Sequence, residues 1–157
     1  PLFWMLIGAG LWSLNPALPG PLALAWAFKA SSTLDSMLGY RRGRLQWLGT
    51  AGARLDDGLT WLPCRLLALS LGQLGPALRD GASDPSPNAG VSQAAYAHAL
   101  GLRLGGLNRY GGIERAKPLL NEGGRAADQQ GVQAILDASQ RSALLWLGLS
   151  GLVALLA

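Results

Sequence analysis

The 157-residue chain is long enough for one ordinary domain, yet half of its residues are hydrophobic and only 14% are charged. The apolar residues come in long blocks, which is typical of a membrane protein and argues against a soluble amphipathic bundle. Cys64 is the single cysteine, which excludes an internal disulfide, and the single histidine argues against a zinc site made of protein ligands alone. The net charge of +4 is spread through two polar loops rather than gathered in one patch, so we expect no nucleic-acid partner.

The first apolar segment covers residues 1–28 and contains no charged side chain. It is long enough to cross a bilayer, which needs about 20 apolar residues, but Pro16, Pro19 and Pro21 interrupt it. It therefore forms either one kinked span or a short re-entrant pair. The chain begins at Pro1, already inside this segment and without an initiator methionine, so we expect it to be part of a longer protein.

The first polar loop is predicted at residues 29–57. Its stretch from Lys29 to Asp35 reads as a capping sequence, and the arginine cluster at 41–44 suits the lipid head groups at the end of a span. At the other end, Asp57 is a natural N-cap for the following helix, with Asp56 beside it. A capping role accounts for only one of these two aspartates, so the other is a candidate for a chemical role.

The second apolar segment, residues 58–78, contains Pro63 and Arg65. An arginine at the centre of a membrane helix costs about 2.5 kcal/mol or more, so Arg65 should face a polar cavity or a partner carboxylate. Asp56 and Asp57 are the candidate partners.

The second polar loop is predicted at residues 79–141. Within it, Asn88 or Ser92 can cap a helix whose alanines suit close packing and which Gly105 and Gly106 end. His98 lies in this helix without an acidic neighbour, which favours a hydrogen-bonded packing role over catalysis. The glycine-rich stretch 104–112, with Arg103 before it and Arg109 within it, suits a phosphate-binding loop but lacks the P-loop pattern.

Asp128 or Gln129 should open a last helix that continues into the third apolar segment, residues 142–157. No stretch shows the alternation of a strand, so we predict an all-α, polytopic integral membrane protein with broken or re-entrant helices, forming a single membrane domain over residues 1–157. The polar loops carry five and seven Lys/Arg residues, a balance that favours a cytoplasmic position for both. We therefore expect the two loops to form one site.

Four sequence blocks resemble the adenosylcobinamide-phosphate synthases of cobalamin (vitamin B12) biosynthesis, the CobD/CbiB type. They are KASSTLDSMLGYR (29–41), ARLDDGLTWLPCRLLAL (53–69), SPNAG (86–90) and ALGLRLGGLNRYGG (99–112). The resemblance extends over essentially the whole chain and corresponds to the C-terminal half of the family. One departure is Ser32, where many relatives have asparagine.

The resemblance implies a multi-pass enzyme of the inner membrane, embedded in the lipid bilayer. It implies an amide ligase that joins aminopropanol phosphate, or a similar amino alcohol, to adenosylcobyric acid with ATP and Mg²⁺. An N-terminal half with further apolar segments completes such proteins. The alternatives are a non-catalytic, sensor-like membrane protein of related fold and a transporter that uses Arg65 and the broken helices as a substrate path.

Forming an amide from a carboxylate requires activation, positive charge on phosphates and a group that accepts the amine proton. The candidates for catalysis are Asp35, Asp56 and Asp57, of which Asp56 and Asp57 are also the candidate Mg²⁺ ligands. The candidate substrate-binding residues are Lys29, Ser31, Thr33, Arg41, Arg54, Arg65, Ser86, Asn88, Gly105, Gly106, Asn108 and Tyr110.

Overall fold

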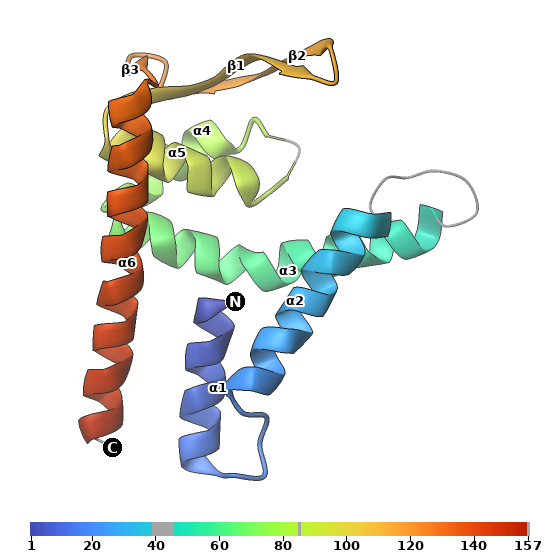
Figure 1. Cartoon of the computed structure of the whole chain (residues 1–157), viewed down its shortest axis with the longest axis vertical. Coiled ribbons are helices and arrows are strands. Elements are labelled where there is room, and N and C mark those ends of the chain that lie inside the picture. The colour runs from blue at the N-terminus through green and yellow to red at the C-terminus, as the bar shows by residue number, and fades with distance from the viewer. Residues whose placement is uncertain (39–45, 85, 157) are drawn as a thin grey trace. The chain divides into compact units, whose positions relative to one another are not determined.

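The computed structural model describes residues 1–38, 46–84 and 86–156. In chain order the elements are α1 (Leu2–Leu14), α2 (Pro21–Leu38), α3 (Gln46–Ser70), α4 (Leu74–Gly81), α5 (Ala89–Ala99), β1 (Leu102–Tyr110), β2 (Ile113–Leu120), β3 (Arg125–Ala126) and α6 (Gln129–Leu156) (Figure 1). They form two compact units, Pro1–Thr60 with Ala143–Ala157, and Trp61–Ser142. The unit boundaries fall inside α3 and α6. That residues 1–157 act as a single domain stays a prediction.

In the first unit, the apolar segment 1–28 forms the antiparallel pair α1 and α2 instead of one long helix (Figure 1). Proline has no N–H to donate and disfavours helix in the preceding residue, so α1 ends before Pro16 and α2 starts at Pro21. Gly8 is buried where α1 meets the start of α2, and a Cβ there would lie only 2.7 Å from the Gly20 carbonyl carbon. The prolines therefore fold this segment back on itself.

The prediction of membrane-spanning helices is wrong for the residues that the structure describes, because none of their helices is both long and apolar enough to cross a bilayer. The helix α1 has 13 residues, fewer than the about 20 that a span requires. The longer α2 includes Lys29 and Asp35, and α6 includes Asp137 and Arg141. Proline breaks and charged residues thus divide the apolar blocks into pieces that are too short.

The all-α prediction is also wrong, because the second unit contains a three-stranded sheet in the order β2-β1-β3. The strands β1 and β2 form an antiparallel hairpin, in which Tyr110 pairs with Ile113 around a Gly111-Gly112 turn. Both turn glycines have positive φ, 55° and 83°, as a two-residue hairpin turn requires. The parallel strand β3 pairs only with the start of β1, Leu102 with Arg125 and Arg103 with Ala126.

A β-bulge in β1, between Leu104 and Gly106, hides the strand in the sequence. The bulge shifts the side-chain alternation by one residue, so the apolar residues of this stretch do not follow a simple period of two. Gly105 has φ of 92°, and a Cβ there would collide with the carbonyl oxygen of Pro118 across the hairpin. The predicted glycine-rich loop is therefore mostly a strand, and Gly105 provides the positive φ that the bulge requires.

The core of the second unit is built around α4 and α5, with small side chains at the contact. Ala77 of α4 and Ala94, Ala95 and Ala97 of α5 are fully buried, which confirms the close-packing surface predicted for this helix. The inner ends of the hairpin, at Leu102 and Leu120, are buried as well. Figure 1 shows the rest of the hairpin extending away from α5, and Leu107 and Ile113 on it are exposed.

The helix boundaries correct the predicted polar loops. Most of the loop predicted at residues 29–57 is helical, since α2 continues to Leu38 and α3 starts at Gln46. Asp57 lies inside α3, so the prediction that it caps a helix is wrong. The last helix does begin at Gln129 after Asp128, whose Oδ1 accepts the N–H of Gly131 at 2.7 Å, as expected of an N-cap.

Candidate functional site

In the first unit, α2 and α3 approach closely near Asp35. A Cβ on the buried Gly52 of α3 would lie 3.5 Å from the backbone nitrogen of Asp35. Ser31 precedes Asp35 by one helical turn on α2, and Asp56 follows Gly52 by one turn on α3. Residues one turn apart share a face of a helix, so this approach gathers polar side chains from two of the predicted blocks.

Asp56 is the unusual side chain of this group. One of its carboxyl oxygens, Oδ1, is buried and has no hydrogen-bond partner among the described residues. Burial raises the pKa of the Asp56 carboxyl above its ordinary value, and the negative charges of Asp35 and Asp57 raise the pKa further. The Oγ of Ser31, whose residue is only 3% exposed, is a second buried oxygen without a partner in the described part of the chain. Buried oxygens normally have a hydrogen-bond partner, so Asp56 and Ser31 are candidates for contact with a bound group.

The remaining predicted residues of the first unit lie around this group. Lys29, Thr33 and Arg54 are exposed, and Asp35 and Asp57 are half-buried. Arg41 lies outside the described residues. Within the described ranges, no three His, Cys, Asp or Glu side chains gather closely enough to enclose a metal ion by themselves.

In the second unit, Arg65 is held by a set of acceptors around the end of its side chain. Its Nη1 donates to the Trp61 carbonyl at 2.9 Å, to Asn88 Oδ1 at 3.0 Å and to Cys64 Sγ at 3.2 Å. Its Nη2 reaches the Pro87 carbonyl at 3.4 Å, and the guanidinium lies 4.2 Å from the centre of the Trp61 ring. Arg65 is thus fixed by backbone, amide and aromatic groups instead of the carboxylate partner that its position suggested.

Asn88 is only 5% exposed, and its Oδ1 accepts from both Arg65 and the Cys64 thiol, the latter at 3.5 Å. Although Asn88 holds the N-cap position of α5, its side chain makes no capping bond. The Oγ of Ser86 accepts the backbone N–H groups of Asn88 and Ala89 instead, at 3.4 and 3.3 Å. Burial raises the pKa of the Cys64 thiol and outweighs the nearby Arg65 charge, so Cys64 is not an activated nucleophile.

A pocket of about 340 Å³ lies next to this cluster. It is lined by Arg65, Leu78, Gly81, Ala82, Asp84, Pro87 and Val91. Arg65 therefore faces a partly polar cavity, as expected for an arginine in an apolar helix. Asp84 was not a candidate from the sequence, because it lies in a turn-rich stretch where aspartate side chains usually accept hydrogen bonds from nearby backbone N–H groups. Its Oδ1 does accept the backbone N–H of Ser86 at 2.9 Å.

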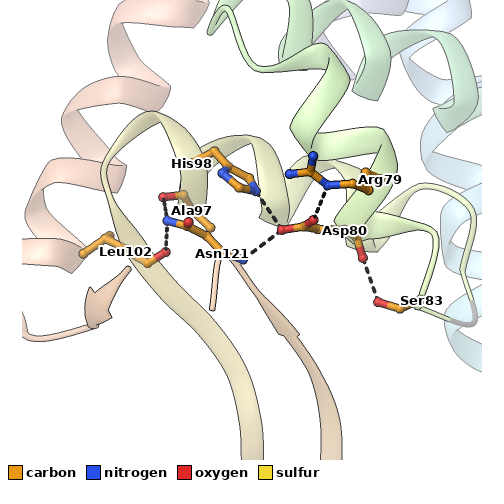
Figure 2. Close-up of polar contacts among 7 residues, drawn as sticks. All are labelled: Arg79, Asp80, Ser83, Ala97, His98, Leu102 and Asn121. Carbon is orange, nitrogen blue, oxygen red and sulfur yellow. Dashed lines mark hydrogen bonds and ion pairs between the residues drawn. The ribbon is translucent and has the colours of Figure 1, made fainter. Parts of the chain in front are cut away.

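A second polar network centres on Asp80 at the end of α4 (Figure 2). Its carboxylate accepts from His98 Nε2 at 2.7 Å, from the backbone N–H of Asn121 at 3.1 Å and from Arg79 Nε at 3.3 Å. Burial acts to raise the pKa of Asp80, but these hydrogen bonds outweigh it and hold the pKa below its ordinary value. His98 is therefore hydrogen-bonded and largely buried, as expected of a packing role, although the sequence did not reveal that Asp80 is its acidic neighbour.

Asn121 completes this network. Its Nδ2 donates to the carbonyls of Ala97 and Leu102, at 3.1 and 3.0 Å, and its backbone has a positive φ of 54° (Figure 2). The end of α4, the end of α5 with the start of β1, and the turn after β2 are thus joined by hydrogen bonds of the Asp80 carboxylate and the Asn121 side-chain amide. The available sequence signal was the Asn-Glu-Gly-Gly stretch at 121–124, since asparagine tolerates this conformation better than most residues.

The predicted residues of the glycine-rich stretch lie on the hairpin. Gly105 and Gly106 are at the bulge of β1, and Asn108 donates from Nδ2 to the Gly106 carbonyl at 3.1 Å. Tyr110 is the last residue of β1. The structure thus brings Asp35, Asp56 and Ser31 together in one unit, and Arg65, Ser86 and Asn88 in the other. That the two groups form one site stays a prediction.

Comparison with known proteins places these residues in a family. A family model described as "CobD/Cbib protein" matches residues 1–139. Proteins called "Cobalamin biosynthesis protein CobD" from Synechocystis sp., Pelobacter propionicus and Klebsiella pneumoniae are 46%, 39% and 38% identical to the chain. The matches cover 100%, 87% and 99% of this chain, but only 46%, 42% and 47% of those relatives.

The chain therefore spans less than half the length of these relatives. No solved structure matches it. The family model covers all four motif blocks, including Asp35, Asp56, Arg65 and Asn88, whose surroundings are described above. On this similarity, the chain belongs to the CobD/CbiB family.

Proposed function

We propose that this chain supplies part of the active site of an amide ligase of cobalamin biosynthesis. The reaction joins the amine of aminopropanol phosphate, or of a similar amino alcohol, to a carboxylate of adenosylcobyric acid. The family similarity supports the role in cobalamin biosynthesis. The observation that carries the proposed chemistry is Asp56, which has a raised pKa and a buried oxygen with no hydrogen-bond partner within the described ranges.

The proposed reaction has two steps. A carboxylate oxygen of the corrinoid attacks the terminal phosphorus of ATP, which releases ADP and forms an acyl phosphate. The amine then attacks the acyl carbon, phosphate leaves with the electron pair of the broken C–O bond, and the amine nitrogen loses a proton. A carboxylate whose pKa is raised is a stronger base, so Asp56 is suited to accept that proton.

The residues near Asp56 also fit a magnesium ion. Mg²⁺ takes oxygen ligands and is usually held by one or two carboxylates together with water and substrate phosphates. Asp56 Oδ1 is a buried carboxylate oxygen without a hydrogen-bond partner in the described part of the chain, and Asp57 is next to it in α3. When bound, the ion would neutralise charge on the phosphates of ATP. A location at the inner membrane stays a prediction.

The complete protein, purified and supplied with adenosylcobyric acid, aminopropanol phosphate, ATP and Mg²⁺, tests the proposal. Product is measured by mass spectrometry and ADP release by a coupled assay. Asp56→Asn should lower the ligation rate about 100-fold or more, the usual contribution of a general base. Asp137→Asn makes the same charge change on exposed α6 and should leave the rate unchanged.

Two outcomes decide between the roles of Asp56. A metal ligand predicts that Asp56→Asn raises the Mg²⁺ concentration needed for half-maximal rate, whereas a base predicts a lower rate at saturating Mg²⁺. An Asp56→Asn rate within about threefold of wild type at saturating Mg²⁺, together with an unchanged Mg²⁺ concentration for half-maximal rate, would exclude both roles. Binding of the corrinoid without any amide product in the wild type would instead favour a sensor-like protein.

A further inference from the structure

The pocket beside α5 contains a positive and a negative side chain that do not pair with each other. Arg65 and Asp84 both line it, yet the two form no ion pair. Opposite charges on one small cavity normally pair unless other groups hold them apart. Here each is held by its own neighbours, Arg65 by Trp61 and Asn88, and Asp84 by the Ser86 N–H.

Both charged groups keep hydrogen-bonding capacity for a ligand. A guanidinium has five N–H donors, and within the described residues Arg65 uses its Nη1 fully, makes one long Nη2 bond of 3.4 Å and has no acceptor for Nε. Asp84 uses Oδ1, and its Oδ2 has no hydrogen-bond partner in the described part of the chain. The pocket thus offers a guanidinium edge and one carboxylate oxygen.

The remaining lining is apolar and small. Leu78, Gly81, Ala82 and Val91 line the pocket together with the two charged residues. The volume of about 340 Å³ is near the lower end of small-molecule pockets, which span roughly 300–1,000 Å³. A complementary ligand is therefore short, with a cationic end, an anionic end and a few carbons between them.

We propose that this pocket binds the amino alcohol phosphate, with Arg65 on the phosphate and Asp84 on the ammonium group. Arginine suits phosphate because its planar donors reach two oxygens at once. The inference rests on the proposed function for the identity of the substrate, and it assigns the substrate to residues of the second unit. Asp84 becomes a specificity residue for the amine.

Isothermal titration calorimetry on the complete protein tests this assignment with three probes. These are aminopropanol phosphate, propyl phosphate, which lacks the amine, and aminopropanol, which lacks the phosphate. Asp84→Asn keeps an oxygen for the Ser86 N–H but removes the negative charge, so it should weaken binding of aminopropanol phosphate about tenfold or more and leave propyl phosphate unchanged. Arg65→Lys should weaken both phosphates and leave aminopropanol unchanged.

Asp137→Asn, with the same charge change on exposed α6, should alter none of the three affinities. The assignment is overturned if Asp84→Asn leaves aminopropanol phosphate binding unchanged or weakens all three probes equally. An amino acid of the same chain length serves as a fourth probe. Tighter binding of that probe than of aminopropanol phosphate would reject the phosphate assignment.

The ligation assay separates failure of this inference from failure of the proposed function. If amide forms and Asp84→Asn leaves the KM for aminopropanol phosphate unchanged, the pocket assignment fails while the ligase function holds. If no amide forms but Asp84 still discriminates aminopropanol phosphate from propyl phosphate, the pocket assignment holds and the ligase function fails.

Discussion

The Nε2 of His98 lies 2.7 Å from Oδ2 of Asp80, and the same oxygen accepts the backbone N–H of Asn121 at 3.1 Å (Figure 2). The carboxylate therefore joins the end of α4 to α5 and to the turn after β2. Asp80 immediately precedes Gly81 and Ala82 in the sequence, and both of these residues line the pocket. This network holds the second unit together next to its candidate binding pocket.

The Asp80 network predicts loss of stability in acid. The folded-state pKa of Asp80 lies below its unfolded value of about 3.9. Its stabilising contribution is therefore fully present above about pH 4 and is lost as the pH falls through the folded-state pKa. Urea unfolding at pH 5 should show wild type more stable than Asp80→Asn, and the difference should shrink below pH 4. A difference that persists at pH 2 would contradict the link to this carboxylate.

Asn121 stabilises the network through both its side chain and its backbone conformation. Asn121→Gly keeps the positive φ but loses two hydrogen bonds, each worth roughly 0.5–1.5 kcal/mol. Asn121→Ala loses the same bonds and adds left-handed strain of about 1–2 kcal/mol. Chemical denaturation should therefore rank wild type above Gly and Gly above Ala. Asn108→Ala, which removes one local bond on the exposed hairpin, should cost less than either.

Gly90 should tolerate no side chain, because α5 starts directly against the end of α4. A Cβ on Gly90 would lie 2.7 Å from Asp84 Cβ and would also meet the Gly81 carbonyl oxygen. Gly90→Ala should reduce the free energy of unfolding by about 1–3 kcal/mol, as overpacked cores do. Gly75→Ala is the control, since a Cβ there meets nothing within 4 Å and alanine favours helix. Equal melting temperatures for the two variants would reject this close approach.

Asp56→Asn should stabilise the fold while it stops ligation. Burial and the Asp35 and Asp57 charges raise the folded-state pKa of Asp56, so its charge opposes folding once the pH exceeds the unfolded value. The variant should melt higher than wild type at pH 7, on the order of 2 °C, and the gain should vanish below pH 4. Asp137→Asn, on exposed α6, should show no such pH-dependent gain. A lower melting temperature for Asp56→Asn at pH 7 would indicate an unrecognised partner for this carboxyl.

Several features of the fold and site follow from local sequence. The prolines at 16, 19 and 21 mark the break between α1 and α2, Asp128 marks the start of α6, and the alanines of α5 mark its packing face. These signals work because capping, proline geometry and small-residue packing act within a few residues of chain. The strands were not predicted, because the bulge at Gly105 disrupts the alternation of apolar and polar side chains along β1.

The four motif blocks, present in order along the chain, are enough to indicate the family, and they single out Asp56, Arg65 and Asn88 as polar or charged residues beside apolar segments. The surroundings of these three side chains depend on the folded structure. It placed Asp84 and Arg65 on the lining of one pocket, gave His98 its acidic partner Asp80, and left Asp56 Oδ1 without a hydrogen-bond partner among the described residues. Each of these relationships joins residues from different helices or turns, and the distances between such segments are fixed by packing of the whole unit, which no local pattern encodes.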